Sequence, residues 1–581
     1  MKINADNGWN AILKLFKYTI LLPFTAIIIY LIYLAGFSTS ITNMDEHTYL
    51  IGDSFWLNVL FVAVLILALL LLHKKTDFLN AFIFKVNNDY ALYIKCRKIM
   101  LSVLFVILAI YVMASQRLGV YDSRDVFTIA DEWTRGIYYS IYEGYLIYYP
   151  HQLGIVIFLY YFSLFFGGNN YAAFEICNAI GVIFTYRAFA ELSDMSGGSR
   201  FASLAILAVC ILFLPILLYT TFAYGTLLGL CFAVNAVMHI YIYISCDAAK
   251  CNGRKTHKWL HLMLSLCELS LAVAIKKNYL IFAIGYIIIC TVFFIKKRSL
   301  QNFIPVIAAA LIVLFSQNVI NSLTVKITGY IPHDGMPTMS WVALGLSEND
   351  SLYDGWWSVR AQNIIREAQF DKTAAKWIEI EYVQDRLKEF IDDPEYAIRF
   401  FSGKNASQWN NPDFNAFHVN NAPSAVTLPE YLDRFFSAST MDTIVRILNP
   451  LHFAILAGAL FYLLLKKDKS DVSLFYCVVF VGGFIFHTVW EAKGQYTLPY
   501  FTLLLPLAVE GYNEVINTVL NFPHLSKKCK IMTISYLTAF LVFGAIINWS
   551  NSTLLNDLFV RSEDTESYIT YLKDANMKDA E

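Results

Sequence analysis

The chain has 581 residues, of which 57% are hydrophobic and 15% are charged, and its mean hydropathy is +0.51. Soluble globular chains carry about 25% charged residues, so this composition excludes a soluble protein and indicates a membrane protein. The 44 Lys and Arg nearly balance the 45 Asp and Glu, giving a formal net charge of -1. This balance excludes the basic surface that nucleic-acid binding requires, so we expect membrane lipid but no nucleic acid among the partners.

Apolar runs long enough to cross a bilayer recur along the chain. The first run has no small-residue cleavage site after it, so we interpret it as a retained span. The shorter run 153–167 is predicted to be a re-entrant or juxtamembrane helix. The remaining runs predict an all-α polytopic membrane protein with about 13 transmembrane helices, over residues 18–36, 56–73, 99–115, 171–190, 201–219, 224–245, 259–275, 280–294, 303–322, 443–465, 472–490, 498–514 and 531–548.

Basic residues predict the orientation, because Lys and Arg accumulate on the cytoplasmic side. With a cytoplasmic N-terminus, and with 153–167 not crossing, the active site falls on the extracytoplasmic side of a multi-pass cell-membrane protein. The loop 116–153, the polar segment 330–441 and the short loop at Lys493 then all lie outside. The basic clusters that fall inside are Lys250/Arg254/Lys255/Lys258, Lys296/Lys297/Arg298, Lys466/Lys467/Lys469 and Lys527/Lys528/Lys530.

The spans and loops divide the chain into five parts. Within the external segment, Asp371 to Phe390 is predicted to be an amphipathic helix that ends before Pro394. Five tryptophans are expected to supply its core: Trp341, Trp356, Trp357, Trp377 and Trp409. The predicted parts are an added N-terminal transmembrane hairpin with a cytoplasmic segment (1–98), a transmembrane catalytic core (99–329), a small extracytoplasmic domain (330–441), C-terminal transmembrane helices (442–548) and an extracytoplasmic tail (549–581).

The first external loop of the catalytic core carries closely spaced charges directly after a span. Asp122, Arg124, Asp125 and Arg135 fall within fourteen positions. The loop also predicts an amphipathic helix lying on the membrane and ending at Gly136, because apolar residues recur at helical spacing. These residues are Val126, Phe127, Ala130 and Trp133.

This loop resembles that of the C-type glycosyltransferase superfamily, in which an Asp is followed by an aromatic residue and then Ile-Ala or Leu-Ala. Here Asp122-Ser-Arg-Asp-Val-Phe-Thr-Ile-Ala130 matches with the aromatic residue displaced by one position. The resemblance continues at 166–170, 186–191 and 274–279. Residues 490–501 are similar to the superfamily's Arg-Tyr-x-x-Pro segment, with Gln495 where Arg is common and Lys493 as its replacement. In pattern the chain is most similar to protein O-mannosyltransferases and bacterial aminoarabinose transferases.

The resemblance implies an integral membrane glycosyltransferase. Such an enzyme transfers a sugar from a polyprenyl-phosphate donor to an acceptor hydroxyl outside the membrane, with inversion of the anomeric carbon. It implies Asp122 as the catalytic base, and Asp125 is the second candidate. The acceptor class stays open between a glycan, a lipid-linked molecule and a protein.

Such a transfer needs cations for the phosphate that leaves. Lys276, Lys277 and Lys493 lie at span ends on the predicted outer side, against the usual distribution, which indicates function. Arg124 and Arg135 are candidates to orient the base or bind phosphate. His151 and Tyr496 complete the predicted substrate-binding residues. A metal cofactor is not required, although the acidic loop offers oxygen ligands that suit a divalent ion.

Other interpretations of the sequence stay open. Asp45-Glu46-His47, between the first two spans, is an alternative acidic site. A membrane polysaccharide polymerase also combines many spans with a large external loop. A lipid-linked glycan transporter requires ionisable residues within spans, and Glu175 and Glu268 are of that kind, but the sequence shows no internal repeat.

Overall fold

The computed structural model describes every residue except 1, 246–256, 350–351, 525, 551–561 and 581. The predicted basic residues Lys250, Arg254 and Lys255, and residues 551–561 and 581 of the predicted tail, lie outside the described residues. In the described residues, 11 helices are long and apolar enough to span a membrane, which confirms the all-α polytopic fold. They are α1 (Lys2–Phe37), α2 (Phe55–Lys75), α4 (Tyr90–Ser115), α8 (Tyr171–Met195), α11 (Gly225–Ser245), α12 (Lys258–Ile275), α13 (Leu280–Lys297), α14 (Ile304–Thr328), α21 (Ala438–Leu465), α22 (Asp471–Val489) and α25 (Lys527–Trp549).

Two more apolar segments are bent, and counting each as one span raises the number of described spans to 13. The predicted span 201–219 is divided into α9 (Arg200–Leu212) and α10 (Leu214–Leu218), at an angle of 60°. Pro215 explains this break, because proline has no N–H to donate and clashes with the preceding turn. The predicted re-entrant run forms α7 (Leu153–Phe166), which follows α6 (Tyr145–Tyr148) after a bend of 107°.

The predicted span 498–514 is also not one helix. It is shared between α23 (Gly494–Thr502) and α24 (Leu504–Leu520), which meet at Leu503. Gly511 allows α24 to pack closely on α21, because a Cβ at this position would lie 1.8 Å from the carbonyl oxygen of Gly458. Close backbone approach of this kind is typical of helix pairs within membranes.

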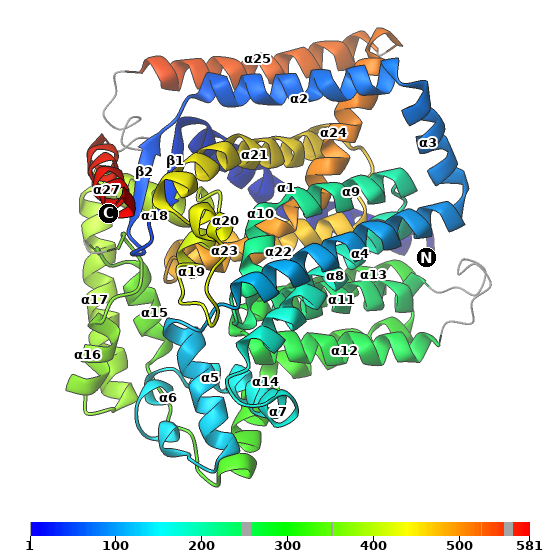
Figure 1. The fold of residues 1–581 in the computed structure, drawn as a ribbon. Helices are drawn as coiled ribbons and strands as arrows, with labels where there is room; N and C mark the ends of the chain where they lie inside the picture. Colours follow the sequence, from blue (N-terminus) through cyan, green and yellow to red (C-terminus); the bar gives the residue numbers. More distant parts are fainter. Residues whose placement is uncertain (1, 246–256, 350–351, 525, 551–561, 581) are drawn as a thin grey trace.

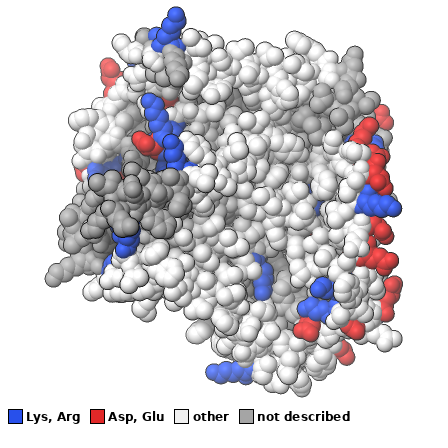
Figure 2. Space-filling model, turned by 180° about the vertical axis from the view of Figure 1, so that it is seen from behind, with Lys and Arg blue, Asp and Glu red and all other residues white. Residues whose placement is uncertain are grey.

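The long helices lie side by side, so their ends gather at two sides of the molecule (Figure 1). The N-terminus and α3 (Asp77–Asn88) lie at one side, and the only described strands lie at the other. Figure 2 shows an uncharged surface over the middle of the molecule, with most of the visible Asp and Glu along one edge. An apolar band of this kind is what lipid contact requires.

The two strands form a hairpin between α1 and α2. β1 (Ser38–Thr42) and β2 (Thr48–Gly52) pair antiparallel, with Ser38 opposite Gly52 and Thr42 opposite Thr48. Both edges have further partners: the Asn410 side chain donates to the Ser38 carbonyl at 2.8 Å, and the Leu50 N–H donates to Asp564 at 2.9 Å. These bonds satisfy edge groups that would otherwise be exposed.

The segment between α14 and α21 forms six helices: α15 (Thr338–Gly345), α16 (Arg360–Glu367), α17 (Lys372–Asp392), α18 (Pro394–Trp409), α19 (Ala416–Val419) and α20 (Glu430–Phe435). Helix α17 confirms that a helix forms here, and the Asp371 side chain caps its N-terminus. It does not have one apolar buried face, since Trp377 and Ile391 are exposed while Glu379 is buried. Trp356 and Trp409 are buried, but Trp409 packs on Phe480 of α22 and Tyr500 of α23 rather than within the segment itself. Trp357 and Trp377 were wrongly expected in the core, since they are 40% and 64% exposed.

One part of this segment, residues 402–420, is polar and yet buried. Its side chains bond to backbone carbonyls of the surrounding elements, as Gln408 does to His487 at 3.0 Å and Asn420 to Leu218 at 3.0 Å. Burial of an amide costs free energy unless the group is hydrogen-bonded, and these bonds offset that cost. The buried polar residues of this stretch are Ser402, Lys404, Asn405, Ser407, Gln408, Asn410, Asn411, Asp413, Asn415, His418 and Asn420.

Candidate active site

Four segments that are far apart in the sequence meet at the hairpin end of the bundle. The loop between β1 and β2 supplies Glu46, and α5 (Tyr121–Thr134) supplies Asp122. The turn between α12 and α13 supplies Lys276. The link from α22 to α23 supplies Glu491 and Lys493. Asp122, Lys276, Glu491 and Lys493 lie at or directly beside helix ends, whereas Glu46 lies at the tip of the hairpin.

Helix α5 presents Asp122 from its first turn. The predicted amphipathic helix is confirmed, since its apolar residues are buried against the bundle while Asp122 is half-buried. A carboxylate in a first turn is favoured by the helix dipole. The adjacent Ser123 hydroxyl donates to the Ala223 carbonyl at 2.9 Å and fixes the start of α5 against the turn before α11.

The carboxyl group of Asp122 is surrounded by two lysines, one acid and one tyrosine. Burial raises the pKa of Asp122 above its ordinary value, and Lys493, Tyr145 and Lys276 partly oppose this rise. Glu46 raises the pKa further by charge repulsion. The balance produces a carboxylate that binds a proton more readily than a solvated Asp, as a general base must.

Lys276 has mainly neutral neighbours. Its ammonium group donates to the Thr226 hydroxyl at 3.0 Å and stands 4.9 Å from the ring centre of Tyr224 and 5.3 Å from that of Tyr496. Rings of this kind attract a cation but only partly replace its hydration. Burial therefore lowers the pKa of Lys276 to about 7, although Asp122 opposes the change.

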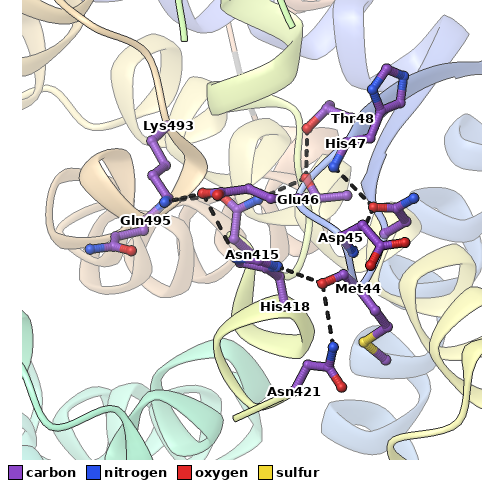
Figure 3. A network of polar contacts seen from close by, with 12 residues as sticks. Met44, Asp45, Glu46, His47, Thr48, Asn415, His418, Asn421, Lys493 and Gln495 are labelled. Carbon is purple, nitrogen blue, oxygen red and sulfur yellow. Dashed lines mark hydrogen bonds and ion pairs between the residues drawn. The ribbon is translucent and has the colours of Figure 1, made fainter. Parts of the chain in front are cut away.

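Lys493 has a charged partner instead. Its ammonium forms an ion pair with Glu46, which also faces the His418 ring at 3.7 Å (Figure 3). Burial lowers the pKa of Lys493, but the attraction of Glu46 outweighs it and holds that pKa above its ordinary value. The neighbouring Glu491 is buried, which raises its pKa to about 8.

The structure therefore brings together four of the predicted site residues: Asp122, Lys276, Lys493 and Tyr496. The two predicted arginines, Arg124 and Arg135, do not face this cluster. Arg124 is 66% exposed and pairs with Asp125 at 3.6 Å, and Arg135 pairs with Asp131 at 2.7 Å near the far end of α5.

His151 and Lys277 lie together beside this cluster. The His151 ring packs against Trp341 with ring centres 5.3 Å apart, and Lys277 is the charged group that acts on it. Trp341 in turn stacks on Trp490 with ring centres 6.3 Å apart. This row of rings joins the short segment before α7, helix α15 and the end of α22.

Three residues of the cluster were not among the predicted site residues. Glu46 belongs to the alternative acidic site Asp45-Glu46-His47, and the available signal was the pair of adjacent acids in the short segment between two spans. Glu491 lies two residues before Lys493, within the segment 490–501 that resembles the superfamily, and no role was predicted for it. His418 carried no signal in the sequence. Among the described residues, no group of three or more His, Cys, Asp or Glu has a geometry that suits a metal ion.

No protein-family model and no curated protein matches the sequence. Among solved structures, the chain is similar to the archaeal oligosaccharyltransferase AglB from Archaeoglobus fulgidus, which was determined in complex with an inhibitory peptide and a dolichol-phosphate. The TM-score is 0.37 and the sequence identity 13%. The match covers 81% of this chain and 56% of that chain, so this chain spans little more than half the length of its match.

Proposed function

We propose that the protein is a membrane glycosyltransferase that moves a sugar from a polyprenyl-phosphate donor to an acceptor hydroxyl on the extracytoplasmic side. The observation that carries this proposal is the half-buried Asp122, which faces two lysines that come from the ends of different spans. A carboxylate and cations held together at a membrane surface suit a reaction between a hydroxyl group and a lipid phosphate.

In the proposed reaction, Asp122 accepts the proton of the acceptor hydroxyl. The hydroxyl oxygen bonds to the anomeric carbon as the bond from that carbon to the phosphate oxygen breaks. The phosphate leaves with the bonding electron pair, and Lys276 and Lys493 stabilise the negative charge that develops on it. One displacement inverts the anomeric carbon. The apolar spans that adjoin the cluster are suited to hold the polyprenyl chain.

Replacement of Asp122 tests the proposed function. Membranes that contain the protein are incubated with a panel of radiolabelled polyprenyl-phosphate sugars, and the labelled product is identified. Asp122→Asn should lower transfer by about 10²-fold or more, since an amide cannot accept the proton. Glu132→Gln, on the same helix, is the matched control and should transfer at the wild-type rate. Amounts of protein in the membrane should be equal.

Asp125→Asn separates the two carboxylates of α5. Because Asp125 pairs with the exposed Arg124, its loss should change the rate much less than loss of Asp122. Full activity of Asp122→Asn, or a larger loss in Asp125→Asn, would remove Asp122 from the mechanism.

A further inference from the structure

Hydrogen bonds within the tip of the hairpin hold Glu46 in one backbone conformation. The Asn43 side-chain oxygen accepts the N–H groups of Asp45 and His47, both at 2.9 Å, and the Glu46 N–H donates to the Asn43 carbonyl at 3.2 Å. Glu46 itself has a φ of 71°, in the left-handed region that is unfavourable for a non-glycine residue. A backbone held in this conformation by its own turn is a reason to look for function.

The conformation turns the Glu46 carboxylate inwards. Figure 3 shows Glu46 pointing to Lys493, whereas the side chain of the preceding Asp45 points away from it. The Glu46 carboxylate pairs with Lys493 and faces His418, whose other ring nitrogen lies 3.0 Å from the Met44 carbonyl. Only 15% of the Glu46 side chain is exposed, so this ion pair is largely shielded from water.

A second set of bonds fixes the distance between the hairpin and Lys493. The Asn415 side chain donates to Thr42, at the end of β1, at 2.7 Å. The same side chain accepts the Gln495 N–H at 3.1 Å, two residues beyond Lys493. Asn415 thus joins the two chain segments that carry the ion pair.

We propose that Glu46 is a positioning residue that holds the Lys493 ammonium and keeps it from neutralising Asp122. The hairpin is then part of the active site, and this inference rests on the proposed function. Lys493 acts on both acids. The other titratable groups that act on Asp122 or are acted on by it are Lys276, Glu491, Asp125, Tyr145, Tyr149, Tyr224 and Tyr496. Without the Glu46 charge, Asp122 is the principal remaining partner of Lys493. Asp122 then becomes a weaker base, and the Lys493 ammonium is drawn to Asp122 instead of to the leaving phosphate.

The first test measures Lys493 directly and requires no enzymatic activity. Acetic anhydride acylates only the neutral amine, so the extent of Lys493 modification against pH, measured by mass spectrometry of the full-length protein, reports the pKa of this lysine. In Glu46→Gln the midpoint should fall by about one pH unit or more, because burial is no longer opposed by the acid. If the substitution only made Lys493 more accessible to the reagent, the extent of modification at high pH would rise and the pH of half-maximal modification would stay the same.

The second test measures transfer. Glu46→Gln should lower kcat about tenfold and move the acidic limb of the pH profile to lower pH, because Asp122 then ionises more readily. Asp45→Asn is the matched control and should behave as wild type in both tests. Glu46→Asp retains the charge, so it should recover part of the rate and keep the labelling midpoint near that of wild type. Equal losses in Glu46→Asp and Glu46→Gln would mean that the hairpin had merely been disrupted, and would overturn the proposal.

The two proposals fail in different ways. An unchanged labelling midpoint and a wild-type rate in Glu46→Gln, alongside an inactive Asp122→Asn, would overturn the role of Glu46 alone. Full activity in Asp122→Asn, or no transfer by the wild type from any donor, would overturn the proposed function while the labelling experiment still showed whether Glu46 holds Lys493.

Discussion

Lys276 and Lys493 both act on Asp122, but their own partners give them different acidities. Lys276 has a hydroxyl and two aromatic rings as neighbours, so burial lowers its pKa to about 7. Lys493 has Glu46, which holds its pKa above the ordinary value. Of these two lysines, Lys276 is therefore the one that loses its charge near neutral pH.

This difference predicts a decline of transfer on the alkaline side. A lowered lysine pKa means that the cation is present below about pH 7 and is lost as the pH rises through that value. We expect kcat/KM of the wild type to fall above about pH 7. In Lys276→Arg the alkaline decline should disappear, because Arg stays charged, even if the absolute rate is lower.

The measurement is kcat/KM from pH 5.5 to 9 for each variant. Lys326→Arg, an exposed lysine near the same end of the bundle, is the control and should keep the wild-type profile. An alkaline decline that persists unchanged in Lys276→Arg would show that another group titrates there.

At this scale the sequence predicted the residues that lie beside span ends and missed those buried by tertiary contacts. Asp122, Lys276 and Lys493 stand out because charge is unexpected at the outer ends of spans. His418 does not stand out, because its partner Glu46 is more than 370 residues away in the chain. No local pattern indicates which helix ends become neighbours.

The hairpin is held from outside by α27 (Ser562–Ala580), which lies beside β2 (Figure 1). Tyr568 is fully buried and its ring centre is 5.2 Å from that of Tyr49. Asp564 accepts the Leu50 N–H, and the Tyr571 hydroxyl accepts the Met44 N–H at 3.5 Å. The helix thus contacts both β2 and the loop that presents Glu46.

We expect Tyr568→Ala to loosen the hairpin. Loss of a buried aromatic ring costs about 3–5 kcal/mol, so the contact of α27 with β2 should weaken. Thermal unfolding of the detergent-solubilised protein should show a lower Tm, and transfer should fall as the Glu46 turn is released. The neighbouring Ile569 is 46% exposed, and Ile569→Ala should change neither quantity. A wild-type Tm and rate in Tyr568→Ala would show that α27 does not support the site.

Element boundaries were largely predictable because they follow from periodicity and capping. The apolar face of α5 and the Asp371 cap of α17 are examples. The break between α9 and α10 was not predicted, although Pro215 lies within that run. Hydropathy alone records that a run is apolar and does not report the direction in which a bent helix continues.

For the whole molecule, the arrangement separates two kinds of charge. Asp122 and its neighbours lie at the hairpin end of the helices, whereas Lys466 and Lys467 follow the opposite end of α21. The distribution of basic residues predicts that this opposite end is cytoplasmic.

Cysteine labelling in intact cells tests this orientation. A membrane-impermeant maleimide should label Asp385→Cys, on the exposed face of α17, and should reach Lys467→Cys only after the membrane is permeabilised. The chain without these substitutions is the background control, because it contains 10 cysteines. The reverse pattern would place the N-terminus and the active site on the opposite sides from those predicted.

The buried polar stretch 402–420 has a consequence for the order of events during biosynthesis. Asn410 bonds to Ser38, from the first part of the chain, while Gln408 bonds to His487, which is made after it. The stretch cannot be enclosed until α22 has been inserted, so its amides stay hydrated while the intervening helices are translated. A nascent chain that stops before α22 holds Asp122 but lacks Lys493 and the wall that supports it. The cluster around Asp122 is therefore completed only after α22 and the link to α23 have been made.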